Sequence, residues 1–173
     1  MVITDKAIRK QTSPAFRWGY IVLPLAVLVL ALILTAVYYG QLPAEVAYRF
    51  KGDGSADRWI NRNQIIMVML LPQLILTLVA GATTWGVIKL SARVQPPQET
   101  GIKAGKIIWL MGNMMALPQS VLTFTLFDIF TYNTSKLHIM PLWVFAVIVM
   151  GGGGIVLGIF FLEALRGARR ATK

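Results

Sequence analysis

Residues 42–59, with the sequence LPAEVAYRFKGDGSADRW, form the longest polar interval between the membrane-length apolar runs of this 173-residue chain. The interval holds three of the seven acidic residues of the chain and three basic ones: Glu45, Asp53, Asp57, Arg49, Lys51 and Arg58. The segments on both sides of it are apolar over lengths that match a lipid bilayer. We therefore expect the rest of the chain to be a membrane scaffold that holds this loop at one face of the bilayer.

The composition is that of a membrane protein. Hydrophobic residues make up 56% of the chain and charged residues 14%, with a mean hydropathy of +0.64, whereas soluble domains carry about 25% charged residues. A helix needs roughly 20 apolar residues to cross a bilayer. Four stretches qualify, at about Trp18–Tyr39, Gln64–Lys89, Ile107–Phe130 and Met140–Leu162. The sequence thus predicts an all-α fold, a four-helix transmembrane bundle with one long extracytoplasmic loop between its first two helices, as a single integral membrane domain over residues 1–173.

The basic residues gather at the ends of the predicted spans. The net charge of +10 therefore has a topological explanation, and we expect no nucleic-acid partner. Twelve basic residues lie on one side: Lys6, Arg9, Lys10, Arg17, Lys89, Arg93, Lys103, Lys106, Arg166, Arg169, Arg170 and Lys173. Five lie on the other side: Arg49, Lys51, Arg58, Arg62 and Lys136. Because basic loops stay in the cytoplasm, we expect cytoplasmic termini and an outward-facing loop 41–63 and turn 133–138.

Residues for catalysis or metal binding are scarce. The chain has no cysteine and one histidine, His138, which we expect to be a solvated loop residue and not a proton switch. The H-E-x-x-H, G-x-S-x-G and Walker patterns are absent from the sequence. We therefore expect no enzymatic activity, no metal site and no cofactor. For an enzyme acting on lipid, the sequence offers no candidate catalytic residue.

A short pattern, L-P-Q-x-x-L-T, occurs at residues 71–77 and again at 117–123. Since the second and third spans run antiparallel, the two copies report either an inverted repeat or a coincidence in a leucine-rich sequence. An interior proline removes one backbone donor, so Pro72 and Pro118 are each expected to kink a helix.

Polar side chains follow the same two spans. Gln73 and Thr77 share one helix face, which Thr84 extends, and Asn113, Gln119, Ser120 and Thr123 form a second stripe. These stripes fit two interpretations: hydrogen bonds that hold helices together, or the lining of a polar cavity or ligand groove.

Two further features lie near the span ends. Asp128 is close to the outer end of the third span and must reach water or a cation, for which Lys136, Arg49 and Arg58 are the candidates. Gly154 and Gly158 form a small-xxx-small pair in the fourth span. Such a pair lets another helix approach closely, either within the chain or in a homo-oligomer.

The loop 42–59 has its own local pattern. Leu42 and Pro43 can end the first span, and Leu42, Val46 and Phe50 recur every fourth residue, which fits a short surface helix or a strand-like return. Gly52 and Gly54 allow a tight turn with positive φ. Asp57 is expected to cap the next helix, and Trp59 to anchor it at the headgroups. The plainest interpretation is a lid that returns the chain to the membrane.

The spacing L-P-x-x-V-x-x-x-F-x-x-x-G-x-x-D-x-W also resembles the signature of a bacterial membrane domain of uncharacterised function, found in proteins similar to the Sdp immunity protein. The resemblance covers about residues 22–80, leaves the second helical hairpin at about 107–162 without a motif, and rests on Leu42, Pro43, Val46, Phe50, Gly54, Asp57 and Trp59. The family often has His before the Phe, where this chain has Arg49.

Two functions follow from these observations. The resemblance implies an immunity- or signalling-type protein of the bacterial cell membrane, whose loop binds an extracellular peptide or a membrane protein partner. The alternative is a small transporter, or an accessory subunit of a membrane complex, that uses the polar stripes of the second and third spans.

Overall fold

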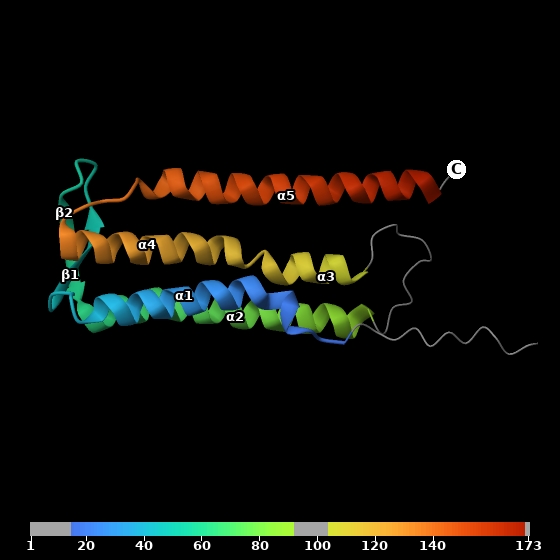
Figure 1. Cartoon of the computed structure of the whole chain (residues 1–173). Helices are drawn as coiled ribbons and strands as arrows, with labels where there is room; N and C mark the ends of the chain where they lie inside the picture. Colours follow the sequence, from blue (N-terminus) through green and yellow to red (C-terminus); the bar gives the residue numbers. More distant parts are fainter. Residues whose placement is uncertain (1–14, 92–103, 172–173) are drawn as a thin grey trace, which may run out of the picture.

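The computed structural model describes residues 15–91 and 104–171, most of them in long helices that run side by side (Figure 1). Their elements are, in chain order, η1 (Trp18–Ile21), α1 (Val22–Tyr39), β1 (Glu45–Phe50), β2 (Ala56–Asn61), α2 (Arg62–Ser91), α3 (Ala104–Asn113), α4 (Ala116–Ser135) and α5 (Leu142–Ala171). Four helical segments are long and apolar enough to cross a membrane: Trp18–Tyr39, Arg62–Leu90, Gly105–Ser135 and Leu142–Phe160. These are the features of a multipass membrane protein, as the sequence predicts.

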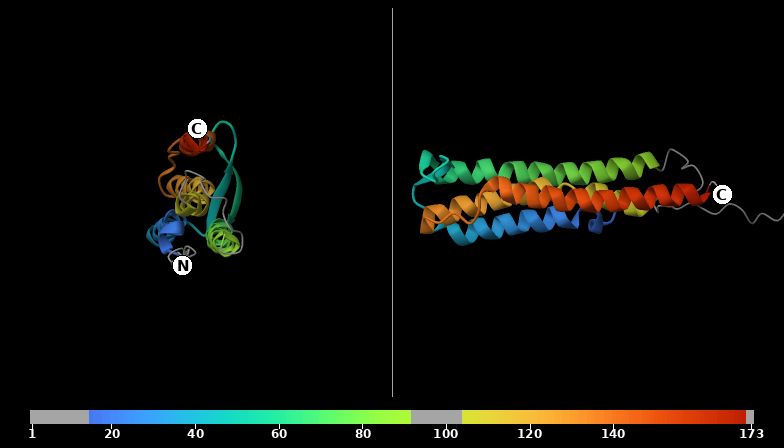
Figure 2. Two further views of the ribbon diagram at one scale, coloured as in Figure 1. Left: turned by 90° about the vertical axis from the view of Figure 1, so that its right-hand side faces the viewer. Right: turned by 90° about the horizontal axis from the view of Figure 1, so that it is seen from above.

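The bundle is elongated and has two different ends (Figures 1 and 2). Helices α1, α2 and α4 pack on one another, with the β1–β2 hairpin across one end, while α5 contacts α4. The basic residues whose side chains the structure describes divide between the two ends as the sequence predicts. Arg17, Lys89 and Lys106 lie at the end away from the hairpin. The side chains of the other nine predicted for that end are outside the described part of the structure: Lys6, Arg9, Lys10, Arg93, Lys103, Arg166, Arg169, Arg170 and Lys173.

The loop between the first two spans is a β-hairpin, so the expectation of an all-α fold is wrong at this point. Strands β1 and β2 pair antiparallel, with Val46 opposite Ile60 and Ala47 opposite Trp59. Side chains on one face of a strand recur every second residue, so apolar residues spaced by four fit a strand as well as a helix. Val46 and Phe50 satisfy both periods, and cross-strand pairing selects the strand.

The hairpin tip is closed by local hydrogen bonds. Lys51 donates its N–H to the carbonyl of Ser55 at 2.9 Å, and Gly54 adopts a φ of 82°, which only glycine takes without strain. Asp53 Oδ1 accepts hydrogen bonds from the hydroxyl and the N–H of Ser55, at 2.7 and 2.9 Å. These two bonds lower the pKa of Asp53, the hydroxyl having the larger effect. The turn is therefore defined by its own residues.

The two prolines have different effects on their helices. Helix α2 continues through Pro72 without interruption. The third span is broken instead, between α3 and α4, at Met114 and Met115. Pro118 has no N–H to donate to the carbonyl of Met114 four residues earlier, and that carbonyl accepts from Leu117 N at 3.1 Å, a tighter turn. The third span is thus interrupted close to its proline, whereas α2 stays helical through Pro72.

The buried apolar core lies toward the hairpin end. It joins α1, the α1–β1 connection, β1, α2 and α4, and its members are Ala31, Leu42, Val46, Ile65, Leu126, Ile129 and Phe130. Elsewhere the helices present large apolar side chains outward, as expected for surfaces that contact lipid.

Helix α5 packs on one side of α4 only. Phe145 stacks on Phe124 with ring centroids 4.1 Å apart, and a Cβ at Gly153 would collide with the side chain of Leu117. A Cβ at Gly154 or Gly158 would meet nothing within 4 Å. The close approach within the chain is therefore made by Gly153, not by the predicted pair.

Gly112 marks the closest helix contact. A Cβ there would collide with the backbone carbonyl of Tyr20 in η1 and with Thr84 Oγ1 in α2. Helix α3 therefore meets η1 and α2 at a point where there is no room for a side chain larger than that of glycine.

We predict that Gly112→Ala lowers the free energy of unfolding by about 1–3 kcal/mol, the usual cost of overpacking, because the carbonyl of Tyr20 cannot move without distorting η1. The matched control is Gly86→Ala in α2, where a Cβ meets nothing within 4 Å. Thermal unfolding in detergent, followed by circular dichroism, measures both. Equal stability of the two variants would contradict this packing.

Candidate functional site at the hairpin end

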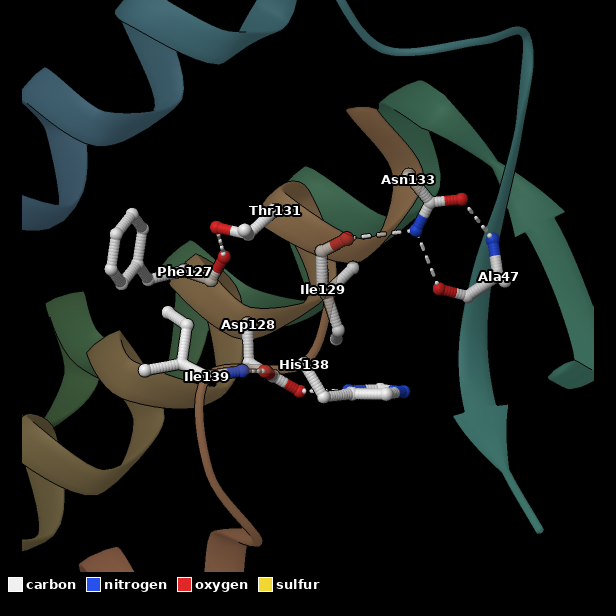
Figure 3. Close-up of polar contacts among 8 residues, drawn as sticks. All are labelled: Ala47, Phe127, Asp128, Ile129, Thr131, Asn133, His138 and Ile139. Atoms are coloured by element: carbon white, nitrogen blue, oxygen red, sulfur yellow. Dashed lines mark hydrogen bonds and ion pairs between the residues drawn. The ribbon is translucent and has the colours of Figure 1, made fainter. Parts of the chain in front are cut away.

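The hairpin is fixed to α4 by the side chain of Asn133 (Figure 3). Its Oδ1 accepts from Ala47 N at 2.9 Å, and its Nδ2 donates to the carbonyls of Ala47 at 2.9 Å and Ile129 at 2.8 Å. Asn133 is 7% exposed and Ala47 is fully buried. A side-chain amide carries the same donor and acceptor as a peptide group, so Asn133 takes the place that a neighbouring strand would occupy beside β1.

One turn earlier on α4, Asp128 binds the segment that leads to α5. Its Oδ2 lies 2.9 Å from His138 Nδ1, and its Oδ1 accepts from Ile139 N at 3.0 Å. The prediction of a lysine or arginine partner for Asp128 is therefore wrong for Lys136, Arg49 and Arg58. Its side-chain partner is a histidine ten residues away. An ionised carboxylate only accepts hydrogen bonds, so His138 Nδ1 is the donor in this pair.

Aromatic rings enclose His138. Tyr132 stacks on the imidazole with centroids 4.6 Å apart, and Phe50 of β1 meets it edge-on at 4.5 Å. A Cβ at Gly54 would lie 3.8 Å from His138 Cδ2, so the hairpin tip reaches the same cluster. His138 is an exposed loop residue, as the sequence predicts, but its ring packs between these neighbours, and 31% of its side chain is accessible.

One ion pair joins the two strands of the hairpin. Arg49 Nε lies 3.3 Å from Asp57 Oδ2, with 59% and 34% of the two side chains exposed. Asp57 does not cap α2, as the sequence suggested, because it lies within β2, five residues before the helix starts. Asn61 fills that role: its Oδ1 accepts from Asn63 N at 2.9 Å.

Two further basic residues lie at helix ends near the hairpin, Arg62 at the start of α2 and Lys136 at the end of α4. Arg62 donates to the carbonyls of Tyr39 and Leu42, at 3.3 and 3.2 Å, at the end of α1. Lys136 takes the left-handed conformation that ends α4, with φ of 59°. Its Nζ lies 5.2 Å from the ring centroid of Tyr132 and 5.9 Å from that of Trp59, which are cation–π distances.

The predicted loop residues divide into two groups. Leu42 and Val46 are buried in the core, Phe50 is half-buried against His138, and Gly54 forms the turn. The exposed members are Pro43, Arg49, Asp57 and Trp59. The buried members build the hairpin, and the exposed ones are available to a partner.

The polar residues inside the spans form a network between α2 and α4. Gln119 Nε2 donates to Thr77 Oγ1 at 2.8 Å and to the carbonyl of Gln73 at 3.0 Å, while Thr123 Oγ1 donates to Gln73 Oε1 at 3.2 Å. Each glutamine of the repeated pattern thus bonds the threonine of the other copy. Gln73 Nε2 and Gln119 Oε1 are buried without a hydrogen-bond partner.

The other predicted polar residues lie outside this network. Asn113 accepts from Leu23 N at 2.8 Å and donates to the carbonyl of Gly19 at 3.2 Å, so it binds the start of the first span. Ser120 bonds its own helix, at the carbonyl of Ala116. Thr84 Oγ1 is buried next to Gly112, without a partner.

Sequence reasoning missed Asn133, Tyr132 and His138 as parts of this site. The sequence does contain a signal for them. Polar residues recur every five positions at an otherwise apolar and aromatic span end: Asp128, Asn133 and His138. Among the side chains that the structure describes, no group of three or more His, Asp or Glu residues is placed to hold a metal ion. The arrangement offers hydrogen bonds, charge and aromatic surface to a partner.

We predict that Asn133→Leu frees the hairpin from α4. The loss leaves the buried N–H and carbonyl of Ala47 unpaired, at a cost of about 1–3 kcal/mol, so hydrogen exchange at Ala47 N–H speeds up by roughly five- to 150-fold. Thr134→Val is the control, because Thr134 bonds only the carbonyls of Phe130 and Thr131 in its own helix. Unchanged exchange in the Asn133 variant would rule out the anchoring role.

The comparisons with known proteins agree with a membrane domain and give no function. No curated protein matches the chain, and no solved structure matches it. Residues 26–76, less than a third of the chain, match the family model described as a domain of unknown function (DUF1648). The matched segment runs from α1 through the hairpin into α2, and so includes the strands of the site described above.

Proposed function

We propose that this protein recognises a polypeptide on the extracytoplasmic side of the bacterial cell membrane through its hairpin end, as an immunity- or signalling-type membrane protein. The observation that carries the proposal is a fixed hairpin with exposed polar and aromatic side chains. Asn133 holds β1 from behind, so Arg49, Asp57 and Trp59 project from a rigid base. Binding costs less when the surface is already ordered.

The outward orientation of the hairpin is part of the proposal. Its support is the division of charge, twelve basic residues on one side against five on the other. The extracellular partner, in turn, is what the resemblance to Sdp-immunity-like proteins implies. The proposal contains no catalytic step.

We predict that a photo-crosslinking amino acid at Arg58, in intact cells of the native host, forms an adduct with an extracytoplasmic polypeptide. The same amino acid at Lys89, at the opposite end of the bundle, is the control and gives no such adduct. Ser55→Cys reports the orientation, because the chain has no native cysteine and a membrane-impermeant maleimide then labels only the hairpin tip.

Two results would refute the proposal. Labelling of Ser55→Cys only after permeabilisation would place the hairpin in the cytoplasm. Adducts at Arg58 that contain only lipid, in correctly oriented protein, would remove the polypeptide partner.

A second candidate function, a small transporter or an accessory subunit, draws support from one observation. Gln73 Nε2 and Gln119 Oε1, a donor and an acceptor, are buried without partners between α2 and α4. Unsatisfied polar groups inside a membrane are costly, and a polar solute that reached them would satisfy both.

We predict that Gln73→Leu and Gln119→Leu distinguish the two interpretations of this network. If it only joins helices, each variant loses about 0.6 kcal/mol of stability per hydrogen bond, and glycerol uptake by proteoliposomes, read by light scattering, does not change. Loss of glycerol uptake with normal expression would favour transport. Thr83→Val is the control, since the exposed Thr83 bonds only carbonyls of its own helix.

A further inference from the structure

The two long edges of the hairpin are not equivalent. In the described residues the sheet has only the strands β1 and β2. The N–H and carbonyl of Ala47 both bond Asn133, so the outer edge of β1 is occupied by a side-chain amide at this position. The described residues place no corresponding group beside β2.

The register shows which backbone groups of β2 face outward. Ala47 lies opposite Trp59, and because Ala47 directs its backbone groups to Asn133, this is a pair without mutual hydrogen bonds. In such an antiparallel pair both residues point their N–H and carbonyl away from each other. The N–H and carbonyl of Trp59 therefore face the open edge.

A second hydrogen bond confirms this pattern. Arg62 N donates to the carbonyl of Ala44 at 3.0 Å, so these two residues are a hydrogen-bonded pair. Because the two kinds of pair alternate along an antiparallel ladder, the neighbouring pair, Glu45 and Asn61, has no mutual hydrogen bonds. The N–H of Asn61 thus faces the same way as that of Trp59, while the carbonyl of Asn61, the residue before α2, accepts the first hydrogen bond of that helix. The open edge therefore presents a donor and an acceptor at Trp59 and a second donor at Asn61.

We propose that β2 is a docking edge to which an extended, acidic segment of another polypeptide adds as a third strand. An open edge is a template for strand addition, in which main-chain hydrogen bonds give affinity and side chains give selectivity. The inference rests on the proposed function and specifies the partner: an extended peptide segment, recognised through its backbone.

The charges around β2 select an acidic segment. Lys51, Arg58 and Lys136 are exposed, and within the described part of the chain none of the three forms an ion pair with a carboxylate. Three carboxylates at this end are already bound: Asp57 to Arg49, Asp128 to His138 and Asp53 to Ser55. The fourth, Glu45, lies on β1, opposite Asn61.

The same charges argue against a second copy of this chain. Pairing β2 with β2 of another molecule would bring two sets of basic side chains together, and like charges across a strand pair are destabilising. An acidic strand gains an ion pair at the same place. Trp59, 50% exposed next to Lys136, adds a ring for contact with an apolar side chain.

The test uses the whole protein in nanodiscs and the peptide acetyl-Glu-Val-Glu-Val-Glu-Val-amide as the probe, with a Lys-Val peptide of the same length for comparison. Trp59→Pro removes the outward N–H, and proline is tolerated on an edge strand. Trp59→Ala removes the ring but keeps the N–H. We expect Trp59→Pro to bind the Glu-Val peptide about tenfold more weakly than Trp59→Ala, the scale of one main-chain hydrogen bond.

Each other outcome overturns the strand-addition model. Equal affinity of the proline and alanine variants would show that the backbone edge is not used, and absence of wild-type binding, or preference for the Lys-Val peptide, would remove the acidic strand. Slow exchange at Ala47 N–H confirms that both variants keep the hairpin. Polypeptide adducts at Arg58 that form equally in the Trp59→Pro background would leave the proposed function standing and refute strand addition alone.

Discussion

The structure depends on a few buried side-chain amides, because two lipid-facing helices gain no hydrophobic stabilisation from associating. In the described part of the chain, the three buried amides that donate from their side-chain nitrogen to another segment all lie on the third span. Asn113 binds the start of the first span, Gln119 binds α2, and Asn133 binds β1. The third span is thus the hub of the bundle. Its break after Asn113 separates the amide that holds the first span from the two that hold α2 and the hairpin.

The same logic explains the place of α5. It offers α4 a phenyl ring and one glycine, at Phe145 and Gly153, with no bridging amide among its described side chains. It therefore lies beside the bundle and leaves the hairpin end open. A groove of about 430 Å³, lined by apolar side chains of α3, α4 and α5 and by Leu23 and Asn113, runs between α5 and the rest. Dispersion contacts and lipid fill such surfaces without defining a site.

The candidate site could be predicted only in part from sequence. The exposed residues Arg49, Asp57 and Trp59 are in the loop that the sequence singles out, and the Gly54 turn follows from its glycines. The partner of Asp128 could not be predicted, because the charge pattern favours lysine or arginine and the imidazole of His138 reaches it by the turn of the chain after α4. Likewise, the bond between Asn133 and β1 could not be predicted, because Ala47 lies 86 positions away in the sequence.

The sequence alone determined the number of spans, their approximate positions and the division of basic residues, because crossing a bilayer requires a minimum apolar length and penalises charge. It also placed Gln73 with Thr77 on one helix face and Gln119 with Thr123 on another, since residues four apart share a helix face. That the two faces meet is a tertiary contact. The sequence did not predict the break of the third span at Met114 and Met115 or its continuation to Ser135. Tertiary structure decided the rest. A spacing of four fits both a helix and a strand, and the hydrogen bonds between β1 and β2, with Asn133 behind them, selected the strand. The strand is thus selected by hydrogen bonds between segments, and the local sequence pattern does not predict those bonds.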